Sequence, residues 1–434
     1  MNISFSKHTL ANGLDVLLHE DHACPIVAVN IWYHVGLKNE QPGRTGFAHL
    51  FEHLMFEGSQ HHDHGFFQPL QGAGATLNGS TNADRTNYWE VVPAGALELA
   101  LWMESDRMGY LLPALTDAKF TNQRDVVLNE RRQNYENRPY GLAPMALLAA
   151  LFPAHHPYHW TTIGDVADLQ AAKLDEVRAF FRRYYHPANA SIAVAGDIDT
   201  EQALALVERY FGEIDPGEPV EPIHVDAGLT GDARIHFEDR VELPRLYLAW
   251  HTPAMFAEGD SDLDLATDLL ANGKTSRLYR RLVFDERLAT DVSASQNSRE
   301  MMGYAQVTAT AAPGHTLAEI EKVILEEIAR LSADGPTDEE IERGRVQAEA
   351  QFMFRLQTVG GFGGKSDQLN AYNVFLKDPS YFPRDLARYQ VCTKASLQAA
   401  VTRYLDPARR VTLSIVPQGR PSLAAHDSTT AAVS

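Results

Sequence analysis

The chain has 434 residues, of which 44% are hydrophobic and 22% are charged, a balance typical of globular proteins that excludes a disordered chain. Lysine and arginine number 38 against 57 aspartates and glutamates, and the net charge of −19 argues against binding to nucleic acid or to an anionic membrane surface. The sequence contains no run of ~18 apolar residues, so it predicts no membrane-spanning helix. Two distant cysteines and no signal-like N-terminus favour a cytoplasmic location but do not exclude the periplasm.

The first half of the chain begins with a hairpin signal and continues with both strand and helix patterns. Asn12-Gly13 suits a tight primed turn between two short strands. Apolar residues then recur at every second position from Val27 to Val35, which predicts a half-buried strand. The remaining patterns predict helices over 46–57, 96–111, 117–135 and 174–185, followed by a buried strand over 190–196.

The second half repeats this order. Four short motifs of the first half, here called anchors, recur in the same order and at a nearly constant distance in the second half. They begin at positions 25 and 244, 54 and 269, 116 and 337, and 184 and 404. A Pro-, Gly- and acid-rich segment, 214–231, predicts a linker between the halves. The sequence therefore predicts an α+β protein of two homologous domains, 1–222 and 223–434, each a mainly antiparallel sheet packed by helices.

Two glycine-rich stretches, 71–79 and 360–364, could suggest phosphate-binding loops. Neither has the Lys-Ser/Thr pair of a P-loop in register. We therefore predict that both stretches form flexible turns.

The strongest chemical signal is His49-Leu50-Phe51-Glu52-His53. On a helix, residues four apart lie on one face, so both imidazoles can share a metal ion, and Glu52 flanks the same face. Catalytic zinc has three protein ligands and keeps a position for water, whose proton a nearby carboxylate can accept. The turn is otherwise apolar, and buried polar groups need partners. The motif therefore predicts a zinc site with Glu52 as general base.

The third ligand is not fixed by local spacing. Glu57 lies on the same helix, two turns from His49, and cannot readily converge on the ion. The histidines at 61, 62 and 64 lie in a polar segment that we expect to be exposed. Glu130 is on a separate predicted helix, but composition alone does not choose it over Glu98 or Glu104.

Longer motifs in a fixed order extend this signal over nearly the whole chain. They are GFAHLFEHLMFEGS (46–59), ATLNGSTNADRTNYWEVVP (75–93), NQRDVVLNERRQNYENRPYG (122–141), HHPYHWTTIGDVADL (155–169) and NGKTSRLYRRL (272–282). With these motifs the chain resembles the pitrilysin, insulinase and mitochondrial processing peptidase family of zinc metallopeptidases, the inverzincins. In its short length the chain resembles the zinc-bearing subunit of a two-subunit bacterial peptidase.

The resemblance implies one Zn²⁺ per chain, bound by His49, His53 and Glu130, with Glu52 as the base. It also implies that an edge strand over 75–81 pairs with the substrate backbone, a mode of binding that holds any extended peptide. The substrate-binding residues expected there are Ala75, Thr76, Leu77, Asn78 and Gly79. For Asn78, a role in holding the scissile region and a role as a turn residue are equally supported.

Some positions depart from the family pattern. Gln123 stands where many members have an outer-shell glutamate, which predicts weaker metal affinity. The Arg and Tyr that contact substrate and oxyanion in the family align here with Val283 and Thr290, whereas Arg277 and Tyr279 are out of register. The second half has no repeat of the metal motif, because positions 264, 267 and 268 are Asp, Thr and Asp.

These features predict a zinc endopeptidase that cleaves short or unfolded peptides inside a chamber of which this chain forms one half. The missing pair predicts a heterodimer in which a paralogous subunit supplies Arg and Tyr. Two alternatives stay open, namely a protease dedicated to one precursor and a non-catalytic assembly subunit of the same fold. The intact metal motif argues against the second alternative.

Overall fold

The computed structural model describes residues 2–225 and 231–432, which cluster into two compact units. Unit 1 comprises Met1–Asn129, Thr162–Ile223 and Gln351–Arg384, and unit 2 comprises Glu130–Thr161, His224–Ala350 and Asp385–Ser434. Each unit therefore contains one segment from the other half of the sequence. These segments are 130–161 and 351–384. The division of the sequence into domains 1–222 and 223–434 stays a prediction.

Unit 1 is built on a six-stranded sheet in the order β1-β2-β6-β3-β5-β4. Its strands are β1 (Ser6–Thr9), β2 (Asp15–Glu20), β3 (Ile26–Tyr33), β4 (Thr76–Thr81), β5 (Thr86–Pro93) and β6 (Ala190–Gly196). The β2–β6 pair is parallel and the other pairs are antiparallel. The predicted hairpin is confirmed, because β1 and β2 pair in antiparallel fashion. The tight primed turn is wrong, because five residues separate the strands, the Gly13 N–H donates to the Leu10 oxygen at 2.9 Å, and Gly13 but not Asn12 has a positive φ.

The helices of unit 1 include those predicted from the apolar spacing. They are α1 (Phe47–Leu54), α2 (Phe67–Gly72), α3 (Leu97–Ala114), α4 (Asp117–Arg131), α6 (Val166–Ala171), α7 (Leu174–Tyr184), α8 (Thr200–Phe211) and α12 (Lys365–Leu376). A π-helical turn, Arg132–Glu136, continues α4 and accounts for the longer helix expected over 117–135. The predicted linker contains no helix or strand over 214–225, and residues 226–230 lie outside the described residues.

The prediction that β3 is half-buried is wrong, because both of its faces are covered. Side chains alternate between the two faces of a strand, and the face opposite the apolar one carries Asn30 and Trp32. Helix α12 covers that face, where the Asp367 carboxylate accepts hydrogen bonds from Asn30 Nδ2 (3.2 Å) and Trp32 Nε1 (2.8 Å). Polar residues on this face have a distant helix as partner, which a local pattern cannot reveal.

Unit 2 repeats the architecture with a six-stranded sheet in the order β12-β7-β11-β8-β10-β9. Its strands are β7 (Ala233–Asp239), β8 (Arg245–Thr252), β9 (Ala289–Asn297), β10 (Gly303–Ala311), β11 (Val411–Pro417) and β12 (Thr429–Thr430). From the second position onward this order matches that of unit 1, strand for strand. The shared order supports the internal duplication predicted from the four anchors.

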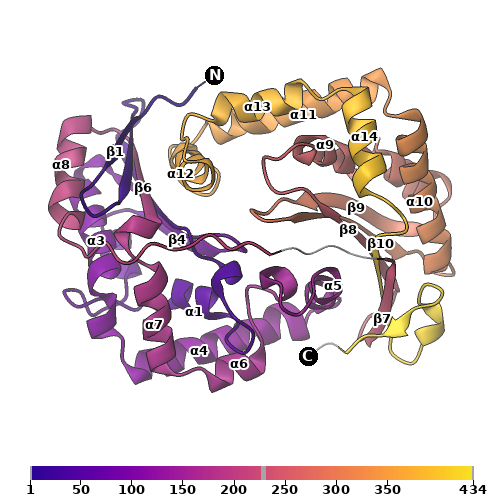
Figure 1. Ribbon diagram of the computed structural model, residues 1–434, viewed down its shortest axis with the longest axis horizontal. Helices are drawn as coiled ribbons and strands as arrows, with labels where there is room; N and C mark the ends of the chain where they lie inside the picture. Colours follow the sequence, from indigo (N-terminus) through magenta and orange to yellow (C-terminus); the bar gives the residue numbers. More distant parts are fainter. Residues whose placement is uncertain (1, 226–230, 433–434) are drawn as a thin grey trace. The chain divides into compact units, whose positions relative to one another are not determined.

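The helices of unit 2 cover both faces of its sheet (Figure 1). They are α5 (Ala143–Leu151), α9 (Asp260–Ala271), α10 (Leu317–Asp334), α11 (Asp338–Arg355, which continues into unit 1), α13 (Phe382–Gln390, which begins in unit 1) and α14 (Lys394–Tyr404). Leu246, Leu248 and Trp250 of β8 belong to the hydrophobic core under α9, α10 and α14. The opposite face of β8 packs on α5, where the ring of His251 lies 4.9 Å from that of Phe152.

The core of unit 1 contains a buried ion pair. Arg107 of α3 is 1% exposed and donates from Nε to Oε2 of Glu104 at 2.8 Å. The guanidinium carbon also lies 3.9 Å from the ring centroid of Phe66 and 4.1 Å from that of Tyr88. Burial and the nearby Glu104 raise the pKa of Glu90 well above its usual value, so the protonated form of Glu90 is favoured there.

Replacing Arg107 with methionine is expected to lower the free energy of unfolding by about 3–5 kcal/mol, because it leaves the Glu104 carboxylate buried without its cation. Arg209→Met is the control, since this arginine is 68% exposed and its pair with Glu98 is worth less than about 1 kcal/mol. Urea unfolding of both variants checks the difference. Equal stability of the two variants would contradict a structural role for the buried pair.

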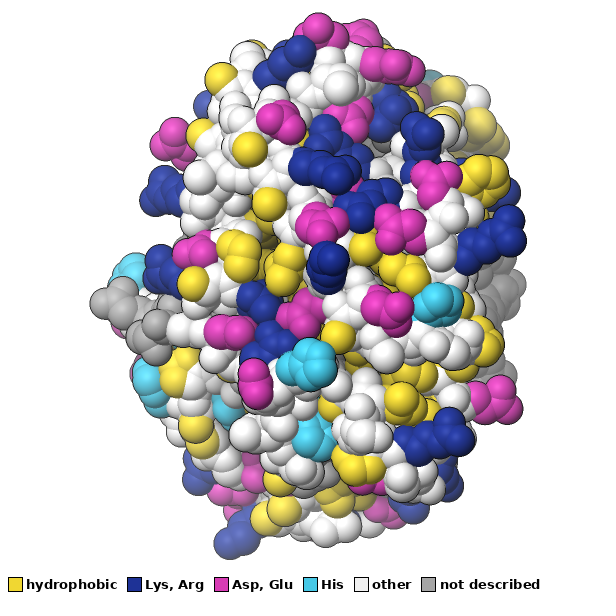
Figure 2. Space-filling model, turned by 90° about the vertical axis from the view of Figure 1, so that its right-hand side faces the viewer, with side chains coloured by type: hydrophobic (Ala, Val, Ile, Leu, Met, Phe, Trp, Pro, Cys, Tyr) yellow, Lys and Arg dark blue, Asp and Glu magenta, His cyan; other side chains and the backbone are white. Residues whose placement is uncertain are grey.

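On the face shown in Figure 2, Lys and Arg side chains lie among Asp and Glu side chains, with hydrophobic side chains scattered between them. The negative net charge therefore does not form a single acidic patch on this face. Among the described helices, none combines the length and the apolar composition of a transmembrane span.

Candidate metal centre

Helix α1 carries the metal motif and begins at a constrained position. Gly46 precedes it with a φ of 86°, and a Cβ there would meet the carbonyl oxygen of Ile163 at 2.9 Å. The Glu40 carboxylate accepts hydrogen bonds from the backbone N–H groups of Gly46 and Ala48, both at 2.9 Å, and so caps the first turn. The apolar side of the helix is buried, which leaves His49, Glu52 and His53 half-buried on the other side.

The three predicted ligands come together. One donor atom from each of His49, His53 and Glu130 lies within 4.8 Å of the other two, and within the described chain this is the only such group of three. The two imidazole rings have centroids 4.8 Å apart and planes at 82°. Two imidazoles and one carboxylate form the donor set of a catalytic zinc site that keeps one position for water, so these residues fit the metal.

A hydrogen-bonded relay supports His53. Its Nδ1 donates to Oε1 of Gln123 at 3.3 Å, and Nε2 of Gln123 donates to the Glu57 carboxylate. A histidine that donates from Nδ1 presents Nε2 to the ion. The sequence indicated that an outer carboxylate is lost at position 123. In the structure Glu57 provides a carboxylate behind Gln123 in the hydrogen-bonded relay, a role that sequence reasoning missed.

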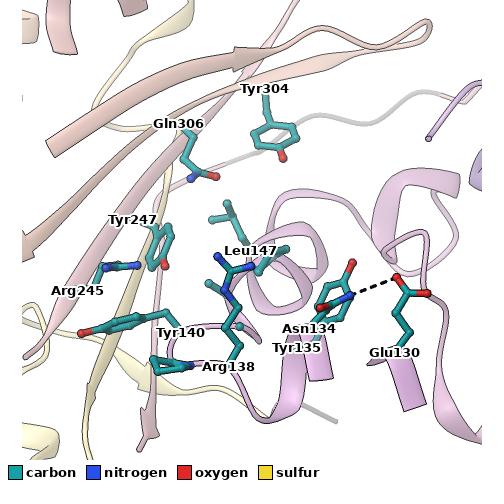
Figure 3. Close-up of a pocket in the computed structure, with 14 residues that line it drawn as sticks. Glu130, Asn134, Tyr135, Arg138, Tyr140, Leu147, Arg245, Tyr247, Tyr304 and Gln306 are labelled. Carbon is teal, nitrogen blue, oxygen red and sulfur yellow. Dashed lines mark hydrogen bonds between the residues drawn. The ribbon is translucent and has the colours of Figure 1, made fainter. Parts of the chain in front are cut away.

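Glu130 is held at the end of α4. Asn134, in the π-helical turn that follows, donates from Nδ2 to Oε1 of Glu130 at 3.3 Å (Figure 3). Burial, with a further contribution from the Glu130 charge, raises the pKa of the nearby Tyr135. The π-helical turn therefore places two polar side chains beside the third ligand, in keeping with the frequent occurrence of such turns at functional sites.

Arg85 is a second residue that sequence reasoning missed. It lies in the turn between β4 and β5 and donates from Nη1 to the backbone oxygen of Ser80 at 2.8 Å. Its guanidinium carbon lies 5.0 Å from the ring centroid of Trp32. Burial lowers the pKa of Arg85, while the charges of Asp367 and Glu52 raise it. Arg85 therefore supports the end of strand β4 through Ser80, and its charge is favoured by that of Glu52, the predicted base.

Comparisons with known proteins identify the family of this chain. Residues 15–160 match the family described as insulinase (peptidase family M16), and residues 171–347 match the domain described as peptidase M16 inactive domain. A zinc protease of Helicobacter pylori, PqqE, is 28% identical over 82% of this chain and 81% of that protein. An uncharacterized zinc protease of Mycobacterium leprae is 30% identical over 77% of this chain and 75% of that protein. The chain belongs to the insulinase family, peptidase family M16.

Solved structures of M16 proteins confirm the predicted α+β fold. The crystal structure of a protease from Helicobacter pylori has a TM-score of 0.88 and 26% identity, and covers 96% of this chain and 100% of that chain. The structure of a peptidase M16 inactive domain from Pseudomonas fluorescens has a TM-score of 0.85 and 19% identity, and covers 96% of this chain and 98% of that chain.

Three of the other residues weighed as ligands have different contacts in this M16 chain, namely Glu98, Glu104 and His61. Glu98 accepts hydrogen bonds from Arg209 and Tyr210 at the surface. Glu104 pairs with Arg107 in the core. His61 is exposed and contacts Asp106 through Nδ1.

Strand β4 covers all but the first residue of the edge strand expected over 75–81, and its role in substrate binding stays a prediction. Strand β4 is at the edge of the sheet, and its only described strand neighbour is β5. Asn78 is exposed, and its Oδ1 accepts the backbone N–H of Gly79 at 2.8 Å. A Cβ on Gly79 would lie 3.0 Å from the Tyr88 ring and 3.2 Å from that of Phe56, so this position requires a small residue.

The second half of this M16 chain has different chemistry at the positions that repeat the metal motif. The Asp264 carboxylate accepts a hydrogen bond from Tyr389 Oη at 2.6 Å. Burial, with contributions from Asp260 and Asp268, raises the pKa of Asp264 to about 7. Arg277, out of register in the sequence, is bound by both oxygens of Glu340 at 2.7 Å.

Replacing Asp264 with asparagine is expected to flatten the pH dependence of stability. The folded-state pKa of about 7 lies above the ordinary value of 3.8, so the folded protein holds an extra proton between about pH 4 and 7. Stability from this group therefore falls as pH rises through that window, by up to ~1.4 kcal/mol per pH unit. Urea unfolding at several pH values checks the slope, with Asp175→Asn as an exposed control; identical slopes for Asp264→Asn and wild type would contradict the assignment.

Proposed function

We propose that this M16 chain is a zinc-dependent endopeptidase that hydrolyses short or unfolded peptides. The observation that carries the proposal is the convergence of His49, His53 and Glu130 within 4.8 Å, with Glu52 on the same helical turn as the two histidines. These three residues would hold zinc, which when bound would supply Lewis-acid polarisation of the scissile carbonyl and a water molecule of lowered pKa.

The chain's own residues would complete the chemistry. Glu52 would accept the proton of the attacking water and transfer it to the leaving amine. Gln123 and Glu57 would hold His53 in one tautomer, and the positive charge of Arg85 would lie close to Glu52.

Strand β4 supports an extended substrate. An edge strand presents unpaired backbone N–H and C=O groups, to which a peptide can add as a further strand. We propose that Ala75, Thr76, Leu77, Asn78 and Gly79 bind the substrate backbone. Main-chain pairing of this kind is indifferent to most side chains, which suits a peptidase of short or unfolded peptides.

The partner proposal follows from Val283 and Thr290. Valine has no hydrogen-bond donor, and the Thr290 hydroxyl donates to Oδ2 of Asp291 at 3.0 Å, so neither side chain offers the donors of an arginine and a tyrosine. We propose that a paralogous subunit supplies that pair across a shared chamber, in a heterodimer. Removal of one such donor typically costs ~10²–10³ in rate, so the isolated chain would be slow.

Hydrolysis of a quenched fluorescent peptide tests both parts of the proposal. The assay compares the zinc-loaded chain alone with the chain mixed with a paralogue that carries Arg and Tyr but a degenerate metal motif. We expect slow hydrolysis alone and an increase of ~10²-fold or more in the mixture. Full activity of the isolated chain would overturn the heterodimer, and no hydrolysis by any zinc-loaded mixture would overturn the peptidase in favour of an assembly subunit.

A further inference from the structure

A cavity of about 550 Å³ opens beside Glu130 and lies entirely within unit 2. Its volume is within the ~300–1,000 Å³ of small-ligand sites. The segment after α4 contributes Arg138 and Tyr140, while β8 and β10 contribute Arg245, Tyr247, Tyr304 and Gln306. In Figure 3, Glu130 lies at one end of the cavity, Arg245 and Tyr247 lie at the other, and Arg138 lies between them.

The charge of this lining is opposite to that of the chain. Two arginines line the cavity, and Glu130 is the only carboxylate among its lining residues. Glu130 is also a proposed metal ligand, and a divalent cation would offset its charge. A cavity with excess positive charge in a chain of net charge −19 indicates a site for an anionic group.

Arg245 is held rigidly. Its Nε donates to Oγ1 of Thr310 at 2.8 Å, and its guanidinium carbon lies 3.7 Å from the ring centroid of Tyr140. Asp291 accepts a hydrogen bond from the same Thr310 hydroxyl at 3.2 Å and balances part of this charge from outside the lining.

Tyr140 is itself fixed in place beneath Arg245. It has a φ of 60°, which is uncommon for a residue with a side chain. Its backbone N–H donates to Asp239 at 2.8 Å, and its hydroxyl donates to the backbone oxygen of Leu243 at 2.7 Å. The surface that supports Arg245 is therefore preorganised.

Arg138 complements this fixed cation with an exposed one. Guanidinium groups match carboxylates in geometry and bind them through paired, charge-assisted hydrogen bonds. The hydroxyls of Tyr247 and Tyr304 and the amide of Gln306 add neutral donors around the same cavity.

We propose that this cavity binds a carboxylate of the peptide substrate, from either an acidic side chain or the C-terminus, next to the scissile bond. The position follows from Glu130, which both lines the cavity and belongs to the metal group. This inference rests on the proposed peptidase function, because it takes the carboxylate to belong to the substrate.

Peptide binding measured by fluorescence anisotropy tests the proposal. The protein is the zinc-loaded Glu52→Gln chain, which is expected to bind without cleaving. Four labelled peptides of one sequence carry Glu or Gln at the varied position and a free or amidated C-terminus. We expect at least one carboxylate-bearing peptide to bind about tenfold more tightly than the neutral Gln amide, and the four arms show which carboxylate is bound.

Variants in the same background locate the effect. Arg138→Ala is expected to remove most of the preference, Arg138→Lys to retain part of it, and Arg420→Ala, an exposed arginine of unit 2 outside the cavity, to leave it unchanged. Thermal unfolding midpoints confirm that the variants are folded. Equal affinity for all four peptides, or a folded Arg138→Ala variant with the full preference, would overturn the proposal.

Hydrolysis of the neutral amide by the wild-type chain, alone or with its paralogous partner, separates this inference from the peptidase function. Cleavage without any carboxylate preference would leave the peptidase standing and overturn the cavity's role. Absence of cleavage of every peptide would overturn the peptidase, while the binding experiment would still decide whether the cavity selects a carboxylate.

Discussion

Replacing Glu52 with glutamine is expected to remove most peptide hydrolysis and to leave zinc binding intact. Glutamine has nearly the same shape as glutamate but cannot accept the proton of the attacking water. General-base catalysis typically contributes 10²–10⁴-fold, so kcat is expected to fall by about that factor. Zinc is expected to remain because Glu52 is not one of the three converging donors.

The measurement pairs kcat on a quenched peptide with zinc content by atomic absorption. Glu201→Gln is the matched control, because it makes the same chemical change at an exposed position on α8. Activity of Glu52→Gln close to that of this control would show that the base has been assigned to the wrong residue.

Removing a ligand is expected to have a different outcome, in which zinc and activity disappear together. His49→Ala leaves two protein donors where a catalytic zinc site uses three. Glu130→Ala is expected to behave in the same way even though it lies 77 residues beyond His53 in the sequence. Gln123→Ala removes only the support of His53, and such changes weaken metal affinity by ~10–100-fold.

Competition with a chromophoric chelator ranks the zinc affinities of these variants. His64→Ala serves as the control, since this exposed histidine lies outside the donor group. The expected order of affinity is wild type and His64→Ala first, then Gln123→Ala, then the two ligand variants. If Glu130→Ala bound zinc as tightly as wild type, the third ligand would have to be sought elsewhere.

The local part of the site could be predicted from the sequence because it depends only on helical spacing. Residues four apart share a face, so His49, Glu52 and His53 define two ligands and a base without knowledge of the fold. Glu130 could not be chosen in this way, because its approach depends on how α4 packs. Only the resemblance to a family distinguished it from Glu98 and Glu104.

Features that depend on contacts between distant segments could not be predicted from the sequence. The pattern of β3 indicated one buried face, but α12 from the other half of the chain covers the second face through Asp367. Similarly, the change from glutamate to Gln123 indicated a lost carboxylate, while the fold supplies Glu57 behind it. In both cases the partner is set by tertiary packing, which overrides a reading of neighbouring residues.

The central claim is that two histidines and one glutamate bind a single zinc ion. X-ray diffraction of the zinc-loaded protein at the zinc absorption edge tests it most directly. We expect one anomalous peak at about 2.0–2.2 Å from a nitrogen of His49, a nitrogen of His53 and an oxygen of Glu130. A peak bound by other residues, or no peak between these three side chains, would contradict it.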